Sequence, residues 1–361
     1  MRVIITAGGT GGHIYPALAI LDKIKEMEPD SEFIYIGTHN RMEKDIVPNR
    51  GIRYIPLEIY GLSTSLKLMG RNIKNIGLIS KATKKCMQIM REFKPDVVIG
   101  VGGYVTYPVI KAAHKCGIMT FVHEQNGIPG KANIALHRSV TQYWLSFKSS
   151  LEYFKNYPAI VLGNPCSEAA IKAKKISKTN YGLAKNKKSV LIFSGSLGST
   201  AMNQSLLEYL KMLDKANYEV LYITGKSSYD AFMENKLPKC VHVVPYIDNL
   251  CGLMKDMDVI VSRAGASSMA EITALGVPCI LIPSPYVANN HQYYNALAIV
   301  ENDAGVMIQQ RDLTPELLKT KIEEILNDDK LAKKYSDNLK GMCEDSPATK
   351  IYENIKEHLN K

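Results

Sequence analysis

The feature that most constrains the fold of this chain is a pattern that occurs twice, once near the start of each half. In each copy a short apolar run, typical of a buried strand, leads into a glycine-rich turn and then into a helical pattern. The apolar runs are Val3–Thr6 and Val190–Phe193, the turns are Ala7–His13 and Ser194–Ser199, and the helices are expected from about Pro16 and about Met202. A strand that feeds a helix through a tight turn is the unit of parallel α/β domains.

A second strand that ends in glycine follows in each half, at 96–103 and 258–265. The chain has 361 residues, 46% of them hydrophobic, which is enough for two cores. We predict two doubly wound parallel-sheet domains, at 1–163 and 164–340, with a hinge near Gly163 and a helix at about 341–361 that can pack back on the first domain. Such sheets bind ligands at the carboxyl ends of their strands, so a cleft between facing glycine-rich turns is expected.

Composition argues against several classes of protein. Apolar runs such as 97–101 and 279–283 are far too short to cross a bilayer, and no secretion signal precedes the first strand pattern, so a soluble or peripheral protein is expected. The seven cysteines include no CxxC pair, which favours reduced thiols in a cytosol. A net charge of +10 favours an anionic partner, but charge alone does not choose between nucleic acid, anionic lipid and small anions.

The first glycine-rich turn, Gly8–Gly12, favours binding of an anion. Its glycines let backbone N–H groups approach a phosphate or a developing oxyanion at the positive end of a helix. Neither this turn nor Gly195–Gly198 fits the GxGxxG fingerprint, and Gly225-Lys226-Ser227 lacks the earlier glycine of a P-loop. A dinucleotide-dependent dehydrogenase is therefore disfavoured, and no cofactor is predicted.

An acidic pair, Asp256 and Asp258, has the spacing that holds a divalent metal in some nucleotide-sugar enzymes. The pair directly precedes the strand pattern 259–261, so an acidic helix end before a buried strand explains both carboxylates. No metal is predicted.

Three polar clusters are the further candidates for a site. Ser268 and Glu271 have the spacing of a helix capping box, whereas the same turn can also present N–H groups and Arg263 to a phosphate while Glu271 accepts ribose hydroxyls. Spacing alone does not separate these interpretations. The clusters 123–126 and 289–295 carry amides and imidazoles that suit sugar hydroxyls, or that simply cap helices.

Together these segments resemble the MurG family of N-acetylglucosaminyltransferases, which are two-domain GT-B enzymes. The resemblance runs almost end to end. The motifs that carry it are GGTGGH with IYPALA at 8–19, RMEKDIVP at 41–48, GVGGYVTYP at 100–108, HEQN at 123–126, GNP at 163–165, SGSLGSTAMN at 194–203, SRAGASSMAEI at 262–272 and HQYYNA at 291–296.

The resemblance implies two Rossmann-like domains that face each other across a cleft, with the first binding the acceptor and the membrane and the second binding UDP-GlcNAc. Glu271 would bind the ribose, Ile247 the uracil, Ser196 a phosphate and Gln292 the sugar hydroxyls. The positions that it implies for donor binding, together with two neighbours that we add, are Thr10, Gly11, Gly12, Asn126, Ser196, Ile247, Arg263, Ala266, Ser267, Ser268, Met269, Ala270, Glu271, Gln292 and Asn295. Gly102, Gly103 and Tyr104 would lie on the acceptor side.

One departure from the family pattern concerns the phosphates of the donor. Cys166 and Ser167 stand where the family usually has a small apolar residue and an arginine, so one contact with the donor phosphate is expected to be missing. Arg263 or a lysine within 172–175 is a candidate to replace it.

The implied reaction inverts the anomeric centre of GlcNAc and links it to the MurNAc 4-hydroxyl of lipid I, which yields lipid II for peptidoglycan. A base must take the proton of the acceptor hydroxyl. His13 is the first candidate, because imidazole titrates near neutral pH, and Glu124 is the second. A helix-capping or phosphate-binding His13 is the plain alternative.

Two rival functions remain open from the sequence. A UDP-GlcNAc 2-epimerase of similar architecture would need no lipid acceptor, and a membrane-docked sensor of UDP-sugars would perform no chemistry.

The segment 62–90 mixes apolar and cationic residues and contains no acidic residue. We expect its later part, 73–90, to be an amphipathic helix on the first domain, and the loop 62–71 to dock on anionic lipid at the cytoplasmic face of the cell membrane. The expected partners are thus UDP-GlcNAc, lipid I and an anionic membrane surface, and not nucleic acid.

Overall fold

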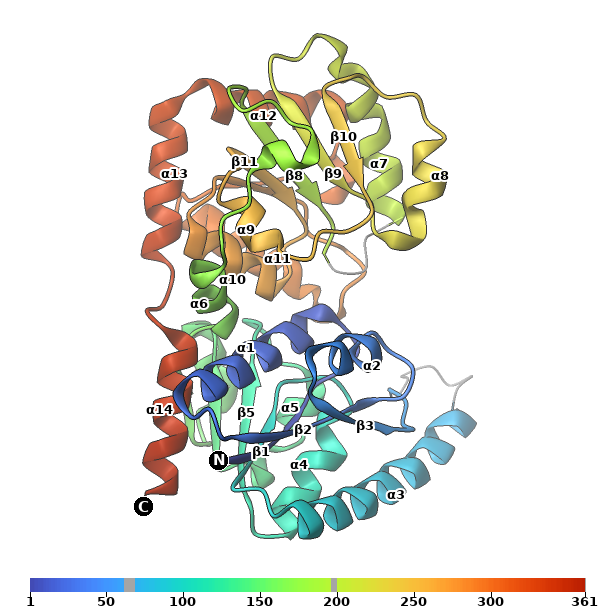
Figure 1. Ribbon diagram of the computed structural model, residues 1–361, viewed down its shortest axis with the longest axis vertical. Helices are drawn as coiled ribbons and strands as arrows, with labels where there is room; N and C mark the ends of the chain where they lie inside the picture. Colours follow the sequence, from blue (N-terminus) through green and yellow to red (C-terminus); the bar gives the residue numbers. More distant parts are fainter. Residues whose placement is uncertain (62–68, 196–199, 361) are drawn as a thin grey trace. The chain divides into compact units, whose positions relative to one another are not determined.

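A computed structural model describes residues 1–61, 69–195 and 200–360 of the chain. Within these residues the chain divides into two compact units, each with its own sheet. Unit 1 comprises Met1–Pro165 and Ser346–Lys361, and unit 2 comprises Cys166–Asp345. Both units are parallel α/β folds with helices on the two faces of the sheet (Figure 1).

The sheet of unit 1 has seven strands among the described residues, in the order β3-β2-β1-β4-β5-β6-β7, and each neighbouring pair is parallel. The strands are β1 (Arg2–Thr6), β2 (Glu32–Thr38), β3 (Arg53–Leu57), β4 (Val97–Gly100), β5 (Met119–Glu124), β6 (Gln142–Leu145) and β7 (Ala159–Val161). The order reverses beside β1, so the carboxyl ends of β1 and β4 form the switch point at which such sheets bind ligands.

Two helical layers cover this sheet. The helices of unit 1 are α1 (Gly11–Met27), α2 (Glu43–Ile46), α3 (Met69–Phe93), α4 (Thr106–Lys115), α5 (Lys131–Ile134) and α14 (Pro347–Leu359). Alternate residues of β1 point to opposite faces, as the period of a strand requires. Val3 and Ile5 pack with α1 and α14, whereas Ile4 packs with α3 and α4.

The sheet of unit 2 has six parallel strands in the described residues, in the order β10-β9-β8-β11-β12-β13. The strands are β8 (Ser189–Phe193), β9 (Glu219–Ile223), β10 (Val241–Val244), β11 (Val259–Ser262), β12 (Cys279–Leu281) and β13 (Val306–Met307). The helices are α6 (Pro165–Lys172), α7 (Thr200–Lys211), α8 (Tyr229–Met233), α9 (Leu250–Met254), α10 (Ala266–Leu275), α11 (His291–Glu301), α12 (Pro315–Asn327) and α13 (Asp329–Gly341). This sheet therefore repeats the switch point of unit 1 beside β8 and β11.

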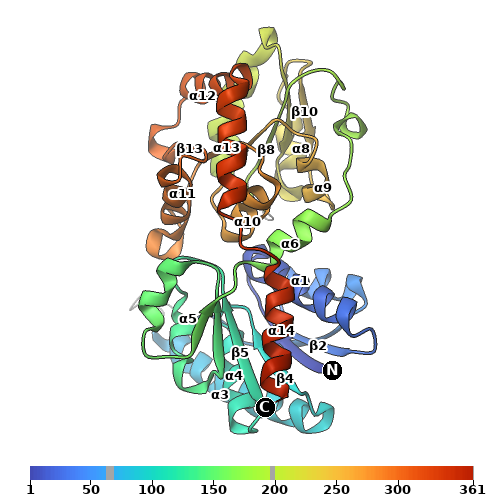
Figure 2. The ribbon, with the colours of Figure 1, turned by 90° about the vertical axis from the view of Figure 1, so that its left-hand side faces the viewer.

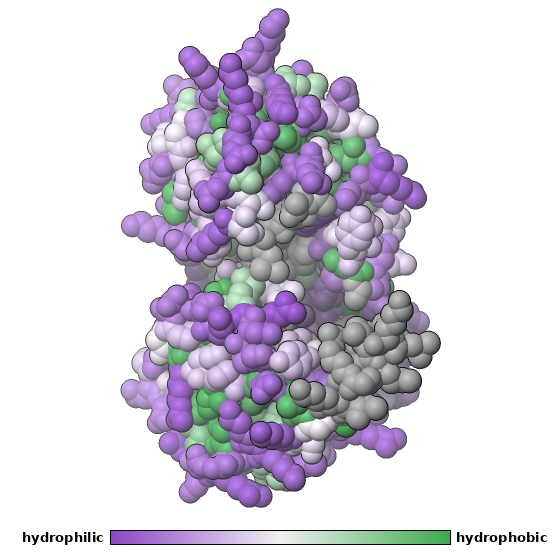
Figure 3. All heavy atoms as spheres, turned by 90° about the vertical axis from the view of Figure 1, so that its right-hand side faces the viewer, coloured by the Kyte–Doolittle hydropathy of each residue, from purple (hydrophilic) through white to green (hydrophobic). Residues whose placement is uncertain are grey.

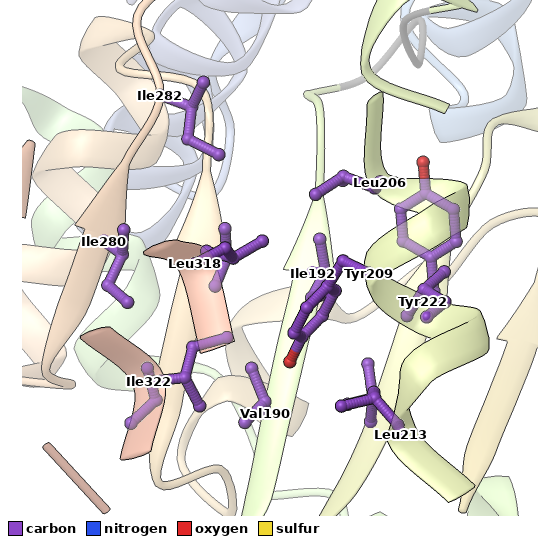
Figure 4. Packing of buried hydrophobic residues seen from close by; sticks show 14 of the residues in the cluster. Val190, Ile192, Leu206, Tyr209, Leu213, Tyr222, Ile280, Ile282, Leu318 and Ile322 are labelled. Carbon is purple, nitrogen blue, oxygen red and sulfur yellow. The ribbon is translucent and has the colours of Figure 1, made fainter. Parts of the chain in front are cut away.

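One core of unit 2 lies between β8 and the helices α7 and α12. Figure 4 shows Val190 and Ile192 of β8 between Leu206 of α7 on one side and Leu318 of α12 on the other. All of these side chains are fully buried. Burial of one such side chain stabilises a fold by roughly 1.5–3 kcal/mol, so this layer holds β8 firmly beneath its glycine-rich turn.

The last helix, α14, belongs to unit 1 and packs beside α1 (Figure 2). Ile351 and Ile355 are fully buried, and Asn354 accepts a hydrogen bond of 2.8 Å from the indole of Trp144. The Glu28 carboxylate at the end of α1 accepts from Tyr352 and pairs with Lys356 at 2.8 Å. These contacts lower the pKa of Glu28 to about 2, and the Lys356 hydrogen bond is the largest cause.

The surface is mostly polar on the face of the molecule that Figure 3 shows, with apolar side chains in small separate groups. In the part of the chain that the structure describes, no helix is both long enough and apolar enough to span a membrane.

Candidate active site

Two glycine-rich turns of unit 1 pack directly against each other at the carboxyl ends of β1 and β4. The Gly8 amide donates a 3.3 Å hydrogen bond to the Gly102 carbonyl. Gly103 has a positive φ of 83°, and a Cβ atom there would lie 2.3 Å from the Gly8 carbonyl oxygen, so any side chain at this position would collide with the backbone. The structure thus brings the predicted acceptor-side glycines against the predicted anion-binding loop.

Helix α1 begins at Gly11, with Thr10 as its N-cap residue, and not at about Pro16. The prediction placed Pro16 in the first turn because proline is favoured there. Instead Pro16 lies inside the helix, where it removes one backbone hydrogen bond and is tolerated because its neighbours Ala17 and Leu18 are buried in the core. Gly11 and Gly12 therefore lie in the first turn, at the positive end of the helix dipole.

His13 lies at the junction of the two turns. Its Nδ1 is 3.1 Å from the Gly8 carbonyl oxygen, which only accepts hydrogen bonds, so Nδ1 carries a proton. In the neutral ring the lone pair is then on Nε2. A Cβ atom on Gly102 would lie 2.9 Å from this Nε2 atom, so Gly102 leaves room for the imidazole. The geometry gives His13 the tautomer that a general base at Nε2 needs.

The HEQN segment was expected to present four polar side chains, but three of them are buried. His123, Glu124 and Gln125 are each at most 1% exposed, and Asn126 alone is partly exposed. His123 donates from Nε2 to the Gly163 carbonyl at 3.0 Å, and burial lowers its pKa to about 4. His123 is therefore neutral and ties β5 to the end of β7.

Glu124, the second candidate for the base, is occupied by its own loop. One carboxylate oxygen accepts from the backbone and the side-chain amide of Asn126, at 3.1 and 3.3 Å. The other accepts from the Gly130 amide at 2.9 Å and from Asn133 at 2.8 Å. Burial raises the pKa of Glu124, and these hydrogen bonds oppose that effect. The geometry suits a group that shapes the loop and disfavours a base that meets an acceptor hydroxyl.

In unit 2, helix α10 begins at Ala266 with Gly265 as its N-cap residue, and no side chain caps it. Of the two interpretations that the spacing of Ser268 and Glu271 left open, the structure does not support the capping box, because the helix begins two residues before Ser268. Ala266, Ser267 and Ser268 form the first turn instead, at the positive end of the helix dipole, which suits a phosphate.

Glu271 lies in the second turn of α10 and is partly exposed. Burial of its carboxyl group raises the pKa to about 7, and a hydrogen bond with the Cys251 thiol opposes the rise. A carboxyl group whose pKa is shifted close to neutral pH is typical of a ligand-binding site. Cys251 was not predicted, because no motif connects it to Glu271 across the intervening residues.

Arg263 is turned into unit 2 and does not offer its guanidinium as freely as predicted. It donates to the Ile282 carbonyl at 3.0 Å and to the Gln310 side chain at 2.7 Å, and burial lowers its pKa to about 10. Arg263 is only 6% exposed. It is therefore a poor candidate to replace the phosphate contact that is expected to be missing at Cys166 and Ser167.

The remaining donor-side predictions lie around the same edge of the sheet. Asn295 is buried and donates to the Ala264 carbonyl at 3.0 Å. Gln292 accepts from the Ser284 amide at 2.8 Å, and Ile247 is 5% exposed in the core beside α10. Met269 is buried there too, and Ala270 is partly exposed. Ser196 lies outside the described residues.

The acidic pair before β11 is held by cations and by the backbone. Asp256 pairs with Lys175 at 2.6 Å, and Asp258 accepts from the Ser189 amide at 2.8 Å. In residues 1–61, 69–195 and 200–360, no group of three or more His, Cys, Asp or Glu side chains is placed to hold a metal ion.

Comparison with known proteins agrees with this architecture in both units. Residues 3–144 match the model of the glycosyltransferase family 28 N-terminal domain, and residues 189–354 match that of the glycosyltransferase family 28 C-terminal domain. Two parallel sheets, each with a topological switch point, together with these matches define a glycosyltransferase of the GT-B class.

Individual relatives narrow the class further. A Bacillus cytotoxicus protein named UDP-N-acetylglucosamine–N-acetylmuramyl-(pentapeptide) pyrophosphoryl-undecaprenol N-acetylglucosamine transferase is 42% identical over 366 residues, which covers 100% of both chains. A protein of the same name from Pediococcus pentosaceus is 39% identical over 99% of both chains. The crystal structure of Acinetobacter baumannii MurG superposes with a TM-score of 0.76 at 25% identity, over 99% of each chain. The chain belongs to the MurG family.

Proposed function

We propose that this protein transfers N-acetylglucosamine from UDP-GlcNAc to the 4-hydroxyl of the N-acetylmuramyl-pentapeptide pyrophosphoryl-undecaprenol acceptor, lipid I, and so forms lipid II for peptidoglycan. The observation that carries this proposal is identity of 42% over the whole length with a relative of that name. The matches of both domains to glycosyltransferase family 28 and the switch point in each sheet support it.

The donor site is proposed on unit 2. Glu271 accepts the ribose hydroxyls, because it lies in the second turn of α10, close to the helix N-terminus, and the residue is only partly buried. The positive end of α10 meets the diphosphate and stabilises the charge that develops as UDP departs. Ile247 offers backbone groups to the uracil, Gln292 contacts the sugar, and Ser196 contacts a phosphate.

The acceptor site is proposed on unit 1, at the packed glycine turns beside Tyr104. His13 Nε2 takes the proton of the acceptor hydroxyl as it attacks the anomeric carbon from the face opposite UDP, so the product is inverted. Glu124 holds the loop that carries Asn126 and serves as a positioning residue. Thr10, Gly11 and Gly12, at the N-terminus of α1, contact the donor.

Docking of unit 1 on the cytoplasmic face of the membrane is the remaining part of the proposal. Of the predicted docking loop 62–71, residues 62–68 lie outside the described residues, and 69–71 belong to α3 and are not a loop. On the described part of α3, Ile76 is 61% exposed, and Lys81, Lys84 and Lys85 are cations on the same helix. Each cation near an anionic surface adds roughly 1 kcal/mol to binding.

A product assay tests the proposal and separates it from its rivals. The protein is incubated with UDP-GlcNAc, with and without lipid I, and the products are separated by chromatography. We expect UDP release only when lipid I is present. Formation of UDP-ManNAc without acceptor would indicate the epimerase, and no product in either reaction would indicate the sensor.

A further inference from the structure

A single peptide group of unit 1 connects His13 to a buried carboxylate that the proposed mechanism does not use. This peptide group joins Gly8 to Gly9. Its carbonyl accepts from His13 Nδ1 at 3.1 Å, and its N–H donates to a carboxylate oxygen of Glu43 at 3.3 Å. The Glu43 carboxylate and the His13 imidazole are therefore hydrogen-bonded to opposite ends of the same peptide group.

Glu43 is fully buried at the start of α2. Its second oxygen accepts from the Thr38 backbone N–H at 3.0 Å and from the Thr38 hydroxyl at 2.5 Å. No cation lies within ion-pair distance of Glu43 in the described part of the chain. A buried carboxylate without a cation is costly even when it is hydrogen-bonded, so simple stabilisation of the fold is a poor explanation for it.

Two glycines make room for this carboxylate. A Cβ atom on Gly8 would lie 2.6 Å from the Glu43 oxygen, and one on Gly37 would lie 2.8 Å from the Glu43 Cγ atom. Gly9, whose N–H donates to Glu43, has a positive φ of 97°, a conformation that favours glycine. Gly8 and Gly9 are thus needed for the approach of the carboxylate and for the direction of the N–H group.

We propose that Glu43, the Gly8–Gly9 peptide group and His13 form a relay in which the Glu43 carboxylate polarises the peptide group and thereby orients His13 and strengthens Nε2 as a proton acceptor. No proton passes through the peptide. Glu43 is a positioning residue, since it acts on the reaction only through His13. The inference rests on the proposed role of His13 as the base.

The physical basis is the mutual polarisation of hydrogen bonds in series. A carboxylate that accepts from a peptide N–H makes the carbonyl of the same peptide a stronger acceptor, which in turn stabilises the protonated imidazole. In the described residues, Tyr35 and Tyr54 couple electrostatically to Glu43, and Asp45 and Tyr104 couple to Tyr54. Burial, with the Glu43 charge as the next cause, raises the pKa of Tyr35 and Tyr54 far above neutral, so neither phenol ionises in the range of the test.

The first test measures His13 directly in the full-length protein by ¹H–¹⁵N NMR, with His13→Gln to assign its signal. Glu43→Gln is isosteric but removes the negative charge that polarises the peptide, and its single amide oxygen cannot accept from both Gly9 and Thr38. We expect the titration midpoint of His13 to fall by about 0.5 pH units in this variant. Thr38→Val, which removes only the hydroxyl contact, is the matched control and is expected to leave the midpoint nearly unchanged.

An unchanged midpoint in folded Glu43→Gln, or an equal fall in Thr38→Val, overturns the relay. If Glu43→Gln does not fold, Glu43→Asp is used, because it keeps the charge but is too short to reach Gly9, and the same fall is expected.

The second test records turnover against pH for the same variants. For Glu43→Gln we expect a plateau about three- to tenfold lower and an acidic limb that moves to lower pH by the same interval as the NMR midpoint. If the NMR midpoint of His13 moves but the acidic limb of the turnover profile does not, the relay is retained and His13 is rejected as the base. Failure of the relay and failure of the proposed base are therefore distinguishable.

Discussion

Glu271 gives the sharpest prediction, because its raised pKa links donor affinity to pH. If the ribose hydroxyls donate to the carboxylate, only the ionised form of Glu271 binds well, and UDP-GlcNAc itself does not titrate between pH 5 and 8 in its diester diphosphate. With a pKa of about 7 in the unliganded protein, the dissociation constant is expected to rise roughly tenfold between pH 8 and pH 6. Isothermal titration calorimetry at several pH values measures this directly.

Glu271→Gln separates the charge from the shape of the side chain. At pH 8 we expect weaker binding, because a charge-assisted hydrogen bond normally contributes about 1.5–3 kcal/mol, and we expect the pH dependence to disappear. The same slope in the variant as in the parent, or an unchanged dissociation constant at pH 8, would refute the ribose assignment.

Glu271→Gln is expected to raise the stability of the fold while it weakens donor binding, so misfolding would not explain the weaker binding. A folded-state pKa of about 7 lies above the ordinary value of 4.5, so protonated Glu271 stabilises the fold below pH 4.5 and this stability is lost as pH rises through 7. At pH 8 the variant is therefore expected to be more stable than the parent by up to roughly 3 kcal/mol. Urea unfolding at pH 5 and pH 8 checks the sign.

Three further predictions concern unit 1. His13→Ala is expected to lower turnover about 10²- to 10⁴-fold with little change in donor affinity, and near-normal turnover would remove it as the base. Glu28→Gln is expected to cost about 1–2 kcal/mol of unfolding free energy at pH 7. Because the pKa of Glu28 is depressed, this stability is present above pH 4.5 and is lost as the pH falls toward 2. An equal loss at pH 7 and at pH 2 would contradict the proposed anchoring of α14 by Glu28. Changing Lys67, Arg71 and Lys74 together to Glu is expected to release the protein from anionic vesicles in a sedimentation assay at moderate salt, and full retention would exclude that docking site.

The strands and their parallel arrangement were predictable because continuous apolar runs between glycine-rich turns have few other solutions. The runs 3–6 and 190–193 became β1 and β8, each an interior strand of its sheet. Helix starts were harder. Pro16 and Ser268 each carry a strong local preference for a first turn or a cap, but core packing extends both helices toward the N-terminus, to Gly11 and Ala266.

The details of the site depend on partners that are distant in sequence. Glu124 looks like an exposed acid beside Asn126, and only the fold reveals that Gly130 and Asn133 occupy it. Arg263 looks available to a phosphate until Gln310 is brought to it. Residue type indicated where chemistry is possible, whereas the direction of each side chain was set by tertiary contacts that no local pattern encodes.

The most direct test of the account is the anomeric configuration of the disaccharide that the protein makes from UDP-GlcNAc and lipid I. The donor is α-linked, so a single displacement assisted by His13 must give a β-linked GlcNAc, which the one-bond carbon–hydrogen coupling of the new linkage identifies by NMR. A β-linked product formed only with lipid I is the predicted result. An α-linked product, or GlcNAc epimerised without transfer, would contradict the account.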